Sequence, residues 1–333
     1  MAIIISISSS EIKYGTSAQL RPTFCRAFPA SLVPLLRDCG SCADGDFFVS
    51  EDRPSYCGAP PSVDVLSSII KLLNCGDDRA VPVWLHFSSN LTNSTIVRSF
   101  TSALDEIRHR EITMEESKVH VRVGPSVSIC SVGRRSGVCV CFEEEDVHVA
   151  CVSRCYEVNE SIVTIAGGAR ALTEALVEVG VNLGSVKHGE DIGPDVAGKV
   201  ADRLKGTFFS DPQGGLDDSG PSSVYYSDMN VISAVMKSFS AVALDDRAEV
   251  SRTLLFVGDL PWLDALFDIE DFCLFIESIC TRLYYGGFNG YSNHAGVNEK
   301  VRFNCLRAGH VLRSEMCWTG LSVCAGVAEA QLK

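Results

Sequence analysis

The chain has 333 residues, of which 46% are hydrophobic and 21% are charged; this excludes a disordered protein and allows one large domain or two modest ones. The 42 acidic and 29 basic side chains give a formal charge of −13, which argues against an autonomous nucleic-acid-binding protein. No run approaches the ~18 uncharged apolar residues of a membrane-spanning helix, and the N-terminus lacks a signal-peptide pattern, so we expect an intracellular protein without a membrane segment.

The 15 cysteines of a chain expected inside the cell are predicted to be reduced and to pack as small hydrophobic groups. Cys39-Gly40-Ser41-Cys42 is the only CxxC sequence, and no second CxxC or HxxxH lies at zinc-ligand spacing. We therefore predict no metal site.

Apolar periodicity predicts alternating strands and helices along the whole chain. The first half indicates, in order, a strand at Ile3–Ile7, a hairpin with a turn at Gly15-Thr16, an irregular stretch at 31–62, a helix from there to Gly76, a strand at Val81–Leu85, a helix over Ile96–Ile107 and a strand at Val119–Val123. The second half indicates strands at Val138–Cys141, Val147–Val152 and Leu254–Val257, and helices after Gly167-Gly168 and at Val196–Leu204, Met229–Phe239, Leu263–Tyr285 and Trp318–Val327. This alternation is typical of α/β layers.

Several of these segments resemble motifs of the actin family in order and spacing. They are IIISISSSEIKYG at residues 3–15, RPTF with FPASL at 21–32, SVGRRSG at 131–137, the hairpin at 141–152, IAGGARALT at 165–173 and MCWTGLSVCA at 316–325. The resemblance implies an α/β fold of the actin/Hsp70/hexokinase type, with two lobes and reduced outer subdomains. The first lobe would comprise residues 1–134 and 313–333, with an outer subdomain at about 31–62. The second would comprise residues 135–312, with an outer subdomain at about 180–223.

In this family, two glycine-rich hairpins surround the nucleotide phosphates, and one Asp from each hairpin acts on the metal-bound water and phosphate. Glycine lets backbone N–H groups approach phosphate closely, and carboxylates suit Mg²⁺. In the first hairpin the Asp position falls on Ser6, the glycine positions fall on Ser8 and Ser10, and Lys13 retains the Lys-x-Gly ending.

The second hairpin departs further from the family pattern. Its Asp position falls on Cys141, and Glu143, Glu144 and Glu145 replace the glycine-rich turn, so three negative charges would face a triphosphate. His148 occupies the place of the family's water-orienting histidine. The remaining nucleotide-site positions are Gly167, Gly168 and Gly258. We expect a pseudo-ATPase with no catalytic residue and no cofactor; residual ATP or ADP binding stays open, because a one-residue shift would bring Glu144 toward the metal position.

The resemblance implies a structural role. A subunit with one intact face and one shortened face can join a filament end and stop its growth. The first hypothesis is a cap on the pointed end of an actin-like filament in a dynactin-type complex, in the cytoplasm, with filament protomers and pointed-end adaptor subunits as partners. The alternative is a nuclear actin-related scaffold of a chromatin-remodelling complex. An active or polymerising ATPase is a third class, against which the hairpins argue.

Overall fold

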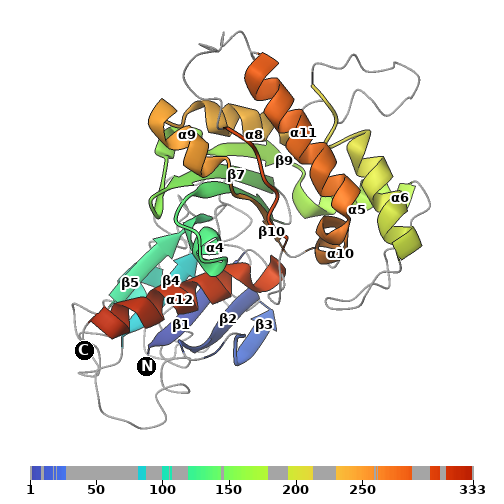
Figure 1. Cartoon of the computed structure of the whole chain (residues 1–333). Helices are drawn as coiled ribbons and strands as arrows, with labels where there is room; N and C mark the ends of the chain where they lie inside the picture. Colours follow the sequence, from blue (N-terminus) through green and yellow to red (C-terminus); the bar gives the residue numbers. More distant parts are fainter. Residues whose placement is uncertain are drawn as a thin grey trace, which may run out of the picture. The chain divides into compact units, whose positions relative to one another are not determined.

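The structure is a computed structural model that describes residues 2–8, 11–17, 19, 21–27, 82–87, 100–104, 106, 119–143, 146–178, 194–212, 230–258, 260, 262–286, 301–307 and 313–331. Contacts divide the chain into unit 1, Met1–Val127 with Cys317–Lys333, and unit 2, Ser128–Met316 (Figure 1). The boundaries predicted from sequence fall after residue 134 and before residue 313. That the units are actin-like lobes stays a prediction.

Unit 1 is built on a five-stranded sheet of order β3-β2-β1-β4-β5. Its strands are β1 (Ile3–Ile7), β2 (Glu11–Thr16), β3 (Phe24–Ala27), β4 (Val83–Phe87) and β5 (Val119–Val123). The chain runs antiparallel from β1 to β2 and from β2 to β3, whereas β1, β4 and β5 are parallel. All five residues of β1 are buried, as expected for a β-branched strand in the middle of a sheet.

One face of this sheet packs against the last helix, α12 (Met316–Gln331). Figure 1 shows α12 running across β1 and β2. The shared core consists of Ala2, Ile4, Trp84 and Val127 with Trp318, Leu321 and Ala325. The Ser322 hydroxyl donates to the Ser17 carbonyl at 2.7 Å, which fixes the helix against the end of β2.

The predicted turn at Gly15-Thr16 is wrong, because both residues belong to β2 and pair with Ile4 and Ile3. The chain instead reverses between Ile7 and Ile12, which face each other. Gly15 is required for a different reason: a Cβ there would lie 2.7 Å from the Thr23 hydroxyl and 2.9 Å from its backbone nitrogen. The glycine therefore allows β2 to approach the chain that enters β3.

Unit 2 has a second sheet of order β10-β6-β7-β8, with β9 also paired to β7. Its elements are α4 (Ser126–Ser131, which begins in unit 1), β6 (Gly137–Phe142), β7 (Asp146–Ser153), β8 (Tyr156–Glu157), the 3-10 turn η3 (Asn159–Ser161), β9 (Val163–Ala166), α5 (Gly168–Glu178), α6 (Pro194–Lys205), α8 (Val231–Ser240), α9 (Leu244–Val250), β10 (Leu254–Gly258), α10 (Leu263–Asp268), α11 (Glu270–Gly286) and η6 (Arg313–Glu315). The strands predicted at Val138–Cys141, Val147–Val152 and Leu254–Val257 are confirmed.

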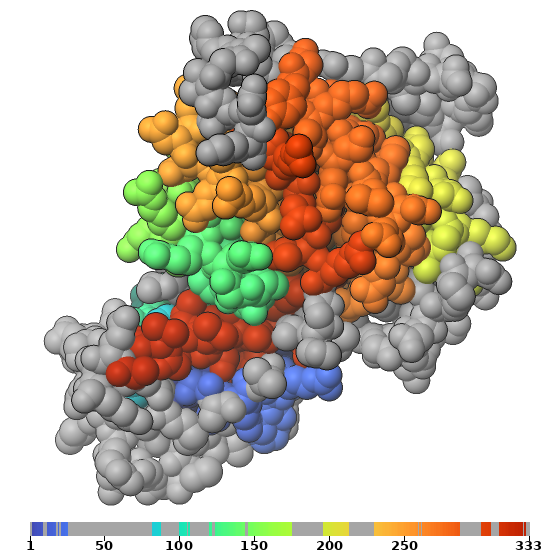
Figure 2. All heavy atoms as spheres, viewed as in Figure 1, coloured from blue at the N-terminus to red at the C-terminus, as the bar shows by residue number. Residues whose placement is uncertain are grey.

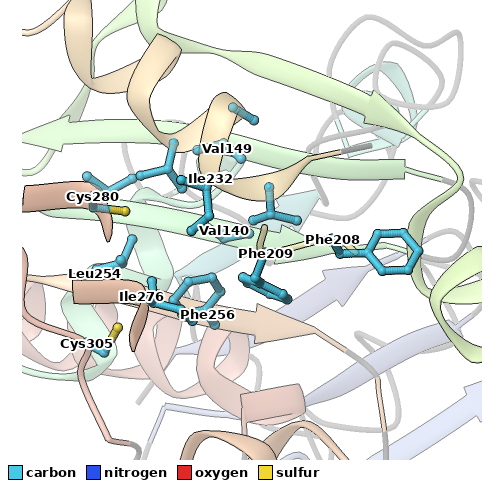
Figure 3. Packing of buried hydrophobic residues seen from close by; sticks show 14 of the residues in the cluster. Val140, Val149, Phe208, Phe209, Ile232, Leu254, Phe256, Ile276, Cys280 and Cys305 are labelled. Carbon is cyan, nitrogen blue, oxygen red and sulfur yellow. The ribbon is translucent and has the colours of Figure 1, made fainter. Parts of the chain in front are cut away.

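The alternation of side chains along β6 and β7 divides unit 2 into two apolar layers. Val140 and Val149 face the larger layer, where they meet Ile232 of α8, Phe256 of β10 and Ile276 of α11 (Figure 3). The opposite face of the sheet carries a smaller cluster: Ile129, Cys139, Cys141, Val152, Leu255, Val257 and Met316. Both faces of β6 are thus covered, and all of its residues are buried.

The two sheets repeat one strand order. In each unit the first two strands form a hairpin, a following strand pairs antiparallel with the second, and a later strand pairs parallel with the first: β1, β2, β3 and β4 in unit 1, and β6, β7, β9 and β10 in unit 2. Unit 2 has in addition the two-residue strand β8, which also pairs with β7. A parallel bridge between Leu254 and Cys305 places residues 301–307 beside β10, as β5 lies beside β4. Apart from β8, the two units therefore share one strand order.

The helix predicted at Leu263–Tyr285 is two helices, because Ile269 is extended (φ −75°, ψ 109°) and separates α10 from α11. Glu270 and Asp271 then begin α11, where negative charge favours a helix N-terminus. The helix predicted after residue 62, the CxxC at Cys39, and the stretches at 31–62, 180–193 and 213–223 lie outside the described residues. Within the described ranges, no helix combines the length and apolar character that crossing a membrane would require.

Candidate functional site

The first Asp position of the resemblance, Ser6, lies on β1 opposite His86 of β4. The Ser6 hydroxyl is 3.0 Å from His86 Nδ1, and His86 Nε2 is 3.3 Å from the Gly124 carbonyl oxygen. Only a ring nitrogen that carries hydrogen can donate to a carbonyl, so Nε2 is protonated and Nδ1 accepts from Ser6. Burial lowers the pKa of His86 to about 4, and the ring is neutral at pH 7. Where the family has a carboxylate, Ser6 therefore has an uncharged hydroxyl whose proton is already donated to His86.

The other first-hairpin positions surround Ser6. Lys13 faces Ser6 across the β1–β2 pair, and Ser8 follows β1 with a half-buried side chain. Ser10 lies outside the described residues. His86 is absent from the sequence-based set, although a histidine within the apolar run Val83–Phe87 was a detectable signal of a buried polar contact.

The second Asp position, Cys141, lies on β6 opposite His148 of β7. Its sulfur lies 3.7 Å from the Cys139 sulfur, and both thiols are buried. The hydrogen bond with Cys139 and then burial raise the pKa of Cys141 well above its ordinary value. The group is therefore a neutral thiol at pH 7, and it neither repels phosphate nor binds a hard cation.

The acidic turn between β6 and β7 is closed by its own backbone. The Glu143 N–H donates to the Asp146 carbonyl at 2.9 Å, and the Glu143 carbonyl accepts from the Ala169 N–H at 2.7 Å. This second bond uses an N–H from the first turn of α5, which would otherwise be open to an anion. Glu144 and Glu145 lie outside the described residues.

Two glycines shape the chain between β9 and α5. Gly167 and Gly168 have φ of 110° and 42°, values that disfavour any side chain with a Cβ. This backbone brings Ala169 to Glu143 across the hairpin, so both glycines are needed for the capped start of α5. The backbone conformation at the start of α5 therefore accounts for both glycines, and no nucleotide-binding role is needed to explain them.

His148 is 6% exposed, and its Nδ1 lies 3.1 Å from the Thr164 hydroxyl of β9. Its Nε2 is buried and has no hydrogen-bond partner among the described residues. Burial lowers the pKa of His148, while the charge of Asp146 opposes this shift. Within the part of the chain that the structure describes, the neutral ring therefore has a hydroxyl rather than a carboxylate as its hydrogen-bond partner.

Gly258 ends β10 beside the last residue of β6, Phe142. A Cβ at Gly258 would lie 2.5 Å from the Phe142 carbonyl oxygen, and its φ is 150°. Close strand packing thus accounts for this glycine. The structure therefore gathers Cys141, Glu143, His148, Gly167, Gly168 and Gly258 around the β6–β7 hairpin of unit 2, and Ser6, Ser8 and Lys13 around the β1–β2 hairpin of unit 1.

Unit 2 also displays an exposed surface that the sequence reasoning missed. The β7–β8 turn consists of Arg154 and Cys155, both with positive φ (54° and 71°), an arrangement that usually requires glycine or asparagine. It is held by bonds from the Arg154 N–H to the Ser136 hydroxyl at 3.0 Å and from the Cys155 N–H to the Arg135 carbonyl. The next residue, Tyr156, is 79% exposed. We call Arg134, Arg135, Arg154, Cys155 and Tyr156 the Tyr156 surface.

No protein-family model matches the chain, and no curated protein is similar to it in sequence. The resemblance to actins therefore depends on the short motifs given above. Within the described residues, no group of three His, Cys, Asp or Glu side chains is arranged to hold a metal ion.

Proposed function

We propose that the chain is a non-catalytic, actin-related structural subunit that caps the pointed end of a short actin-like filament in a dynactin-type complex. The observation that carries the proposal is the chemistry of the two hairpins. Where the family has carboxylates, Ser6 is bonded to a neutral histidine and Cys141 is a buried neutral thiol. Neither group can activate water as a carboxylate does, which favours a structural role.

The repeated strand order supports the two-lobed fold on which this proposal depends. The resemblance implies one phosphate hairpin from each lobe, and each unit begins its sheet with a hairpin, β1–β2 or β6–β7. The motif matches at residues 3–15 and 141–152 coincide with these hairpins. In an unrelated α/β protein, we would not expect both phosphate-hairpin motifs to fall on the first hairpin of each sheet.

The Tyr156 surface supports a role in protein assembly. Tyrosine and arginine are enriched in the residues that contribute most binding energy at protein interfaces. Arg134 and Arg135 are exposed, and neither has an ion-pair partner among the described residues. Figure 2 shows the segments around residues 130 and 155, in two shades of green, side by side on the surface of unit 2. An exposed tyrosine that directly follows a turn held by hydrogen bonds loses little conformational freedom when a partner covers it.

The capping role depends on a difference between the two faces by which an actin-like subunit contacts its neighbours in a filament: one is intact and the other is shortened. The outer subdomains predicted at about 31–62 and 180–223 are short, and in an actin filament these subdomains form the pointed-end face. A filament continues only while each subunit offers both of its heterologous faces. A protomer on one face and adaptor subunits on the shortened face would place the chain in the cytoplasmic cytoskeleton.

Affinity purification of the full chain from cells tests the partners. We expect actin-like protomers and dynein-activator subunits with the wild-type chain, and loss of the protomers with Tyr156→Arg. Leu274→Arg is the matched control, because Leu274 is an apolar residue on α11 that is 51% exposed and lies outside the Tyr156 surface. Recovery of a Snf2-type motor would favour the nuclear scaffold, and equal protomer recovery by both variants would contradict the role of Tyr156.

Two further measurements test the capping and pseudo-ATPase proposals separately. A titration with Mg-ATP should show no micromolar binding; tight binding would refute the pseudo-ATPase. Polymerised actin-like protomers should stop growing at one end when the chain is added. Long filaments of the purified chain alone would refute the cap.

A further inference from the structure

The arginines of the Tyr156 surface are attached to a backbone that hydrogen bonds hold in place. Arg134 follows the last turn of α4, where the Gly133 N–H donates to the Cys130 carbonyl at 3.0 Å. The Arg134 N–H donates to the Ile129 carbonyl at 3.3 Å. With Gly133 at a φ of 68°, these two bonds form the Schellman motif that ends many helices. The backbone that carries Arg134 is therefore fixed before any partner binds.

A second set of hydrogen bonds joins this segment to the turn between β7 and β8. The Cys155 N–H donates to the Arg135 carbonyl at 2.6 Å, and the Arg154 N–H donates to the Ser136 hydroxyl at 3.0 Å. The Ser136 hydroxyl in turn donates to Glu249 of α9 at 2.8 Å. Because Ser136 is only 3% exposed, water has little access to these bonds. The two segments that carry the arginines therefore form one support, and they lie side by side in Figure 2.

Tyr156 lies beside Arg154 on this support. Ser153 and Tyr156 are opposite each other in the β7–β8 pair, so their side chains lie on the same face. The Ser153 hydroxyl donates to Asp246 Oδ2 at 3.0 Å, and the Arg154 guanidinium donates to Asp246 Oδ1 at 3.1 Å. Asp246 thus positions Arg154, whose side chain is still 71% exposed and has further N–H groups to donate.

The charges of the surface indicate what kind of group it can bind. Arg134 and Arg135 are exposed, and no ion pair joins either of them to a carboxylate of the described residues. Asp246 and Glu249 already accept hydrogen bonds from the surface itself. A guanidinium presents a planar fork of N–H donors that matches a carboxylate. The ring of Tyr156, 79% exposed, can pack against an apolar side chain next to such carboxylates.

We propose that the Tyr156 surface binds an acidic segment of a partner protein, whose carboxylates pair with Arg134 and Arg135 and whose apolar side chain covers the ring of Tyr156. This inference deepens the proposed function and rests on it for the view that the surface is a protein interface. Under that function, the acidic segment belongs to the actin-like protomer.

The net charge of the chain favours a short acidic segment over a larger polyanion. The formal charge is −13, so an RNA strand or an anionic membrane would bring many negative charges toward an acidic protein. Exposed charges interact over only about 10 Å at 0.1 M salt. A short segment therefore interacts mainly with the arginines that it covers, whereas RNA or a membrane extends beyond them.

The test measures the binding of a fluorescein-labelled peptide to the purified full chain by fluorescence anisotropy. The peptide has two Asp-Glu pairs, one on each side of a leucine. We expect saturable binding at about 50 mM NaCl that weakens about tenfold at about 500 mM, because salt screens exposed ion pairs. Peptides with Asn-Gln in place of each Asp-Glu, or with serine in place of the leucine, should bind at least about tenfold more weakly.

Substitutions separate the surface from the overall charge of the chain. Arg134→Gln combined with Arg135→Gln should weaken binding about tenfold, and Tyr156→Ser should do the same. Tyr156→Phe keeps the ring and should bind as the wild type does. The matched control combines Lys237→Gln with Arg302→Gln, which removes the same charge from exposed positions of unit 2 outside the surface. It should bind within about twofold of the wild type, and thermal unfolding checks that every variant is folded.

Three results would overturn the inference. One is equal binding of the acidic peptide and its Asn-Gln counterpart to the wild-type chain, a comparison that needs no substitution. Another is an equal loss of affinity in the double arginine variant and in the matched control. The third is arginine-dependent binding of oligouridine RNA or of phosphatidylserine vesicles that is tighter than binding of the peptide, which would assign the surface to another class of partner.

Failure of this inference is distinguishable from failure of the proposed function. If the peptide does not bind but Tyr156→Arg still loses actin-like protomers in the affinity purification, the surface binds the protomer by other chemistry; the inference is then overturned and the function is supported. If the peptide binds through the arginines but no protomer is recovered, the acidic-segment chemistry is supported and the proposed function is overturned.

Discussion

Acidification should destabilise unit 1 through His86. The ring is neutral in the folded protein, with a pKa of about 4 against 6.5 in the unfolded chain, so the unfolded state binds the proton first. Stability from this group is therefore present above pH 6.5 and is lost as the pH falls toward 4. Between pH 7 and pH 5 the linkage relation gives a loss of about 2 kcal/mol. His86→Gln should remove this loss, because glutamine does not titrate.

Urea unfolding followed by tryptophan fluorescence measures this effect. Two of the three tryptophans, Trp84 and Trp318, lie in unit 1. Trp262 is in unit 2, and its indole nitrogen has no hydrogen-bond partner among the described residues, so Trp262→Phe restricts the signal to unit 1 without breaking a bond that the structure describes. The free energy of unfolding is compared at pH 7 and pH 5 with and without His86→Gln. An equal pH dependence in both proteins would refute the buried neutral histidine.

Four other substitutions, at three positions, test the packing of unit 2. Gly258→Ala should lower the free energy of unfolding by about 3 kcal/mol, since its Cβ would overlap the Phe142 carbonyl, as chemical denaturation can measure. Gly198→Ala, in α6 with open space around it, should instead stabilise by about 0.5–1 kcal/mol, and destabilisation by both would contradict the steric reason. Cys141→Asp should lower the melting temperature more than Cys141→Ser, and calorimetry should detect no gain of Mg-ATP binding.

The strands near the hairpins could be predicted because their signals are local. The β-branched run Ile3–Ile7 and the alternation around Val138 and Val147 specify strands through the burial of their own side chains. The break at Ile269 could not be predicted, because the apolar residues of α10 and α11 continue one helical pattern across it. The duplicated strand order also has no counterpart in a repeated sequence period.

The resemblance to actins identified the candidate positions, whereas their hydrogen bonds and protonation states could be determined only from the structure. Ser6 and His86 are 80 residues apart, and only the parallel register of β1 and β4 brings them together. The neutrality of Cys141 likewise depends on Cys139 and on burial in the smaller apolar cluster on one face of the sheet. The Tyr156 surface depends on a turn whose two residues have unusual backbone angles, which sequence preferences disfavour.

The position of α12 in the chain has a consequence for biosynthesis. Ile4 and Trp84 are covered by Trp318 and Leu321, yet the residues that form this cover are synthesised only after unit 2. From Val127 to Cys317 the ribosome adds 317 − 127 = 190 residues, which takes about 10–40 s at typical translation rates. Throughout this interval, the sheet of unit 1 has an uncovered apolar face while unit 2 can already form its core. A holdase chaperone that recognises apolar strands would thus have its longest opportunity at the N-terminal unit.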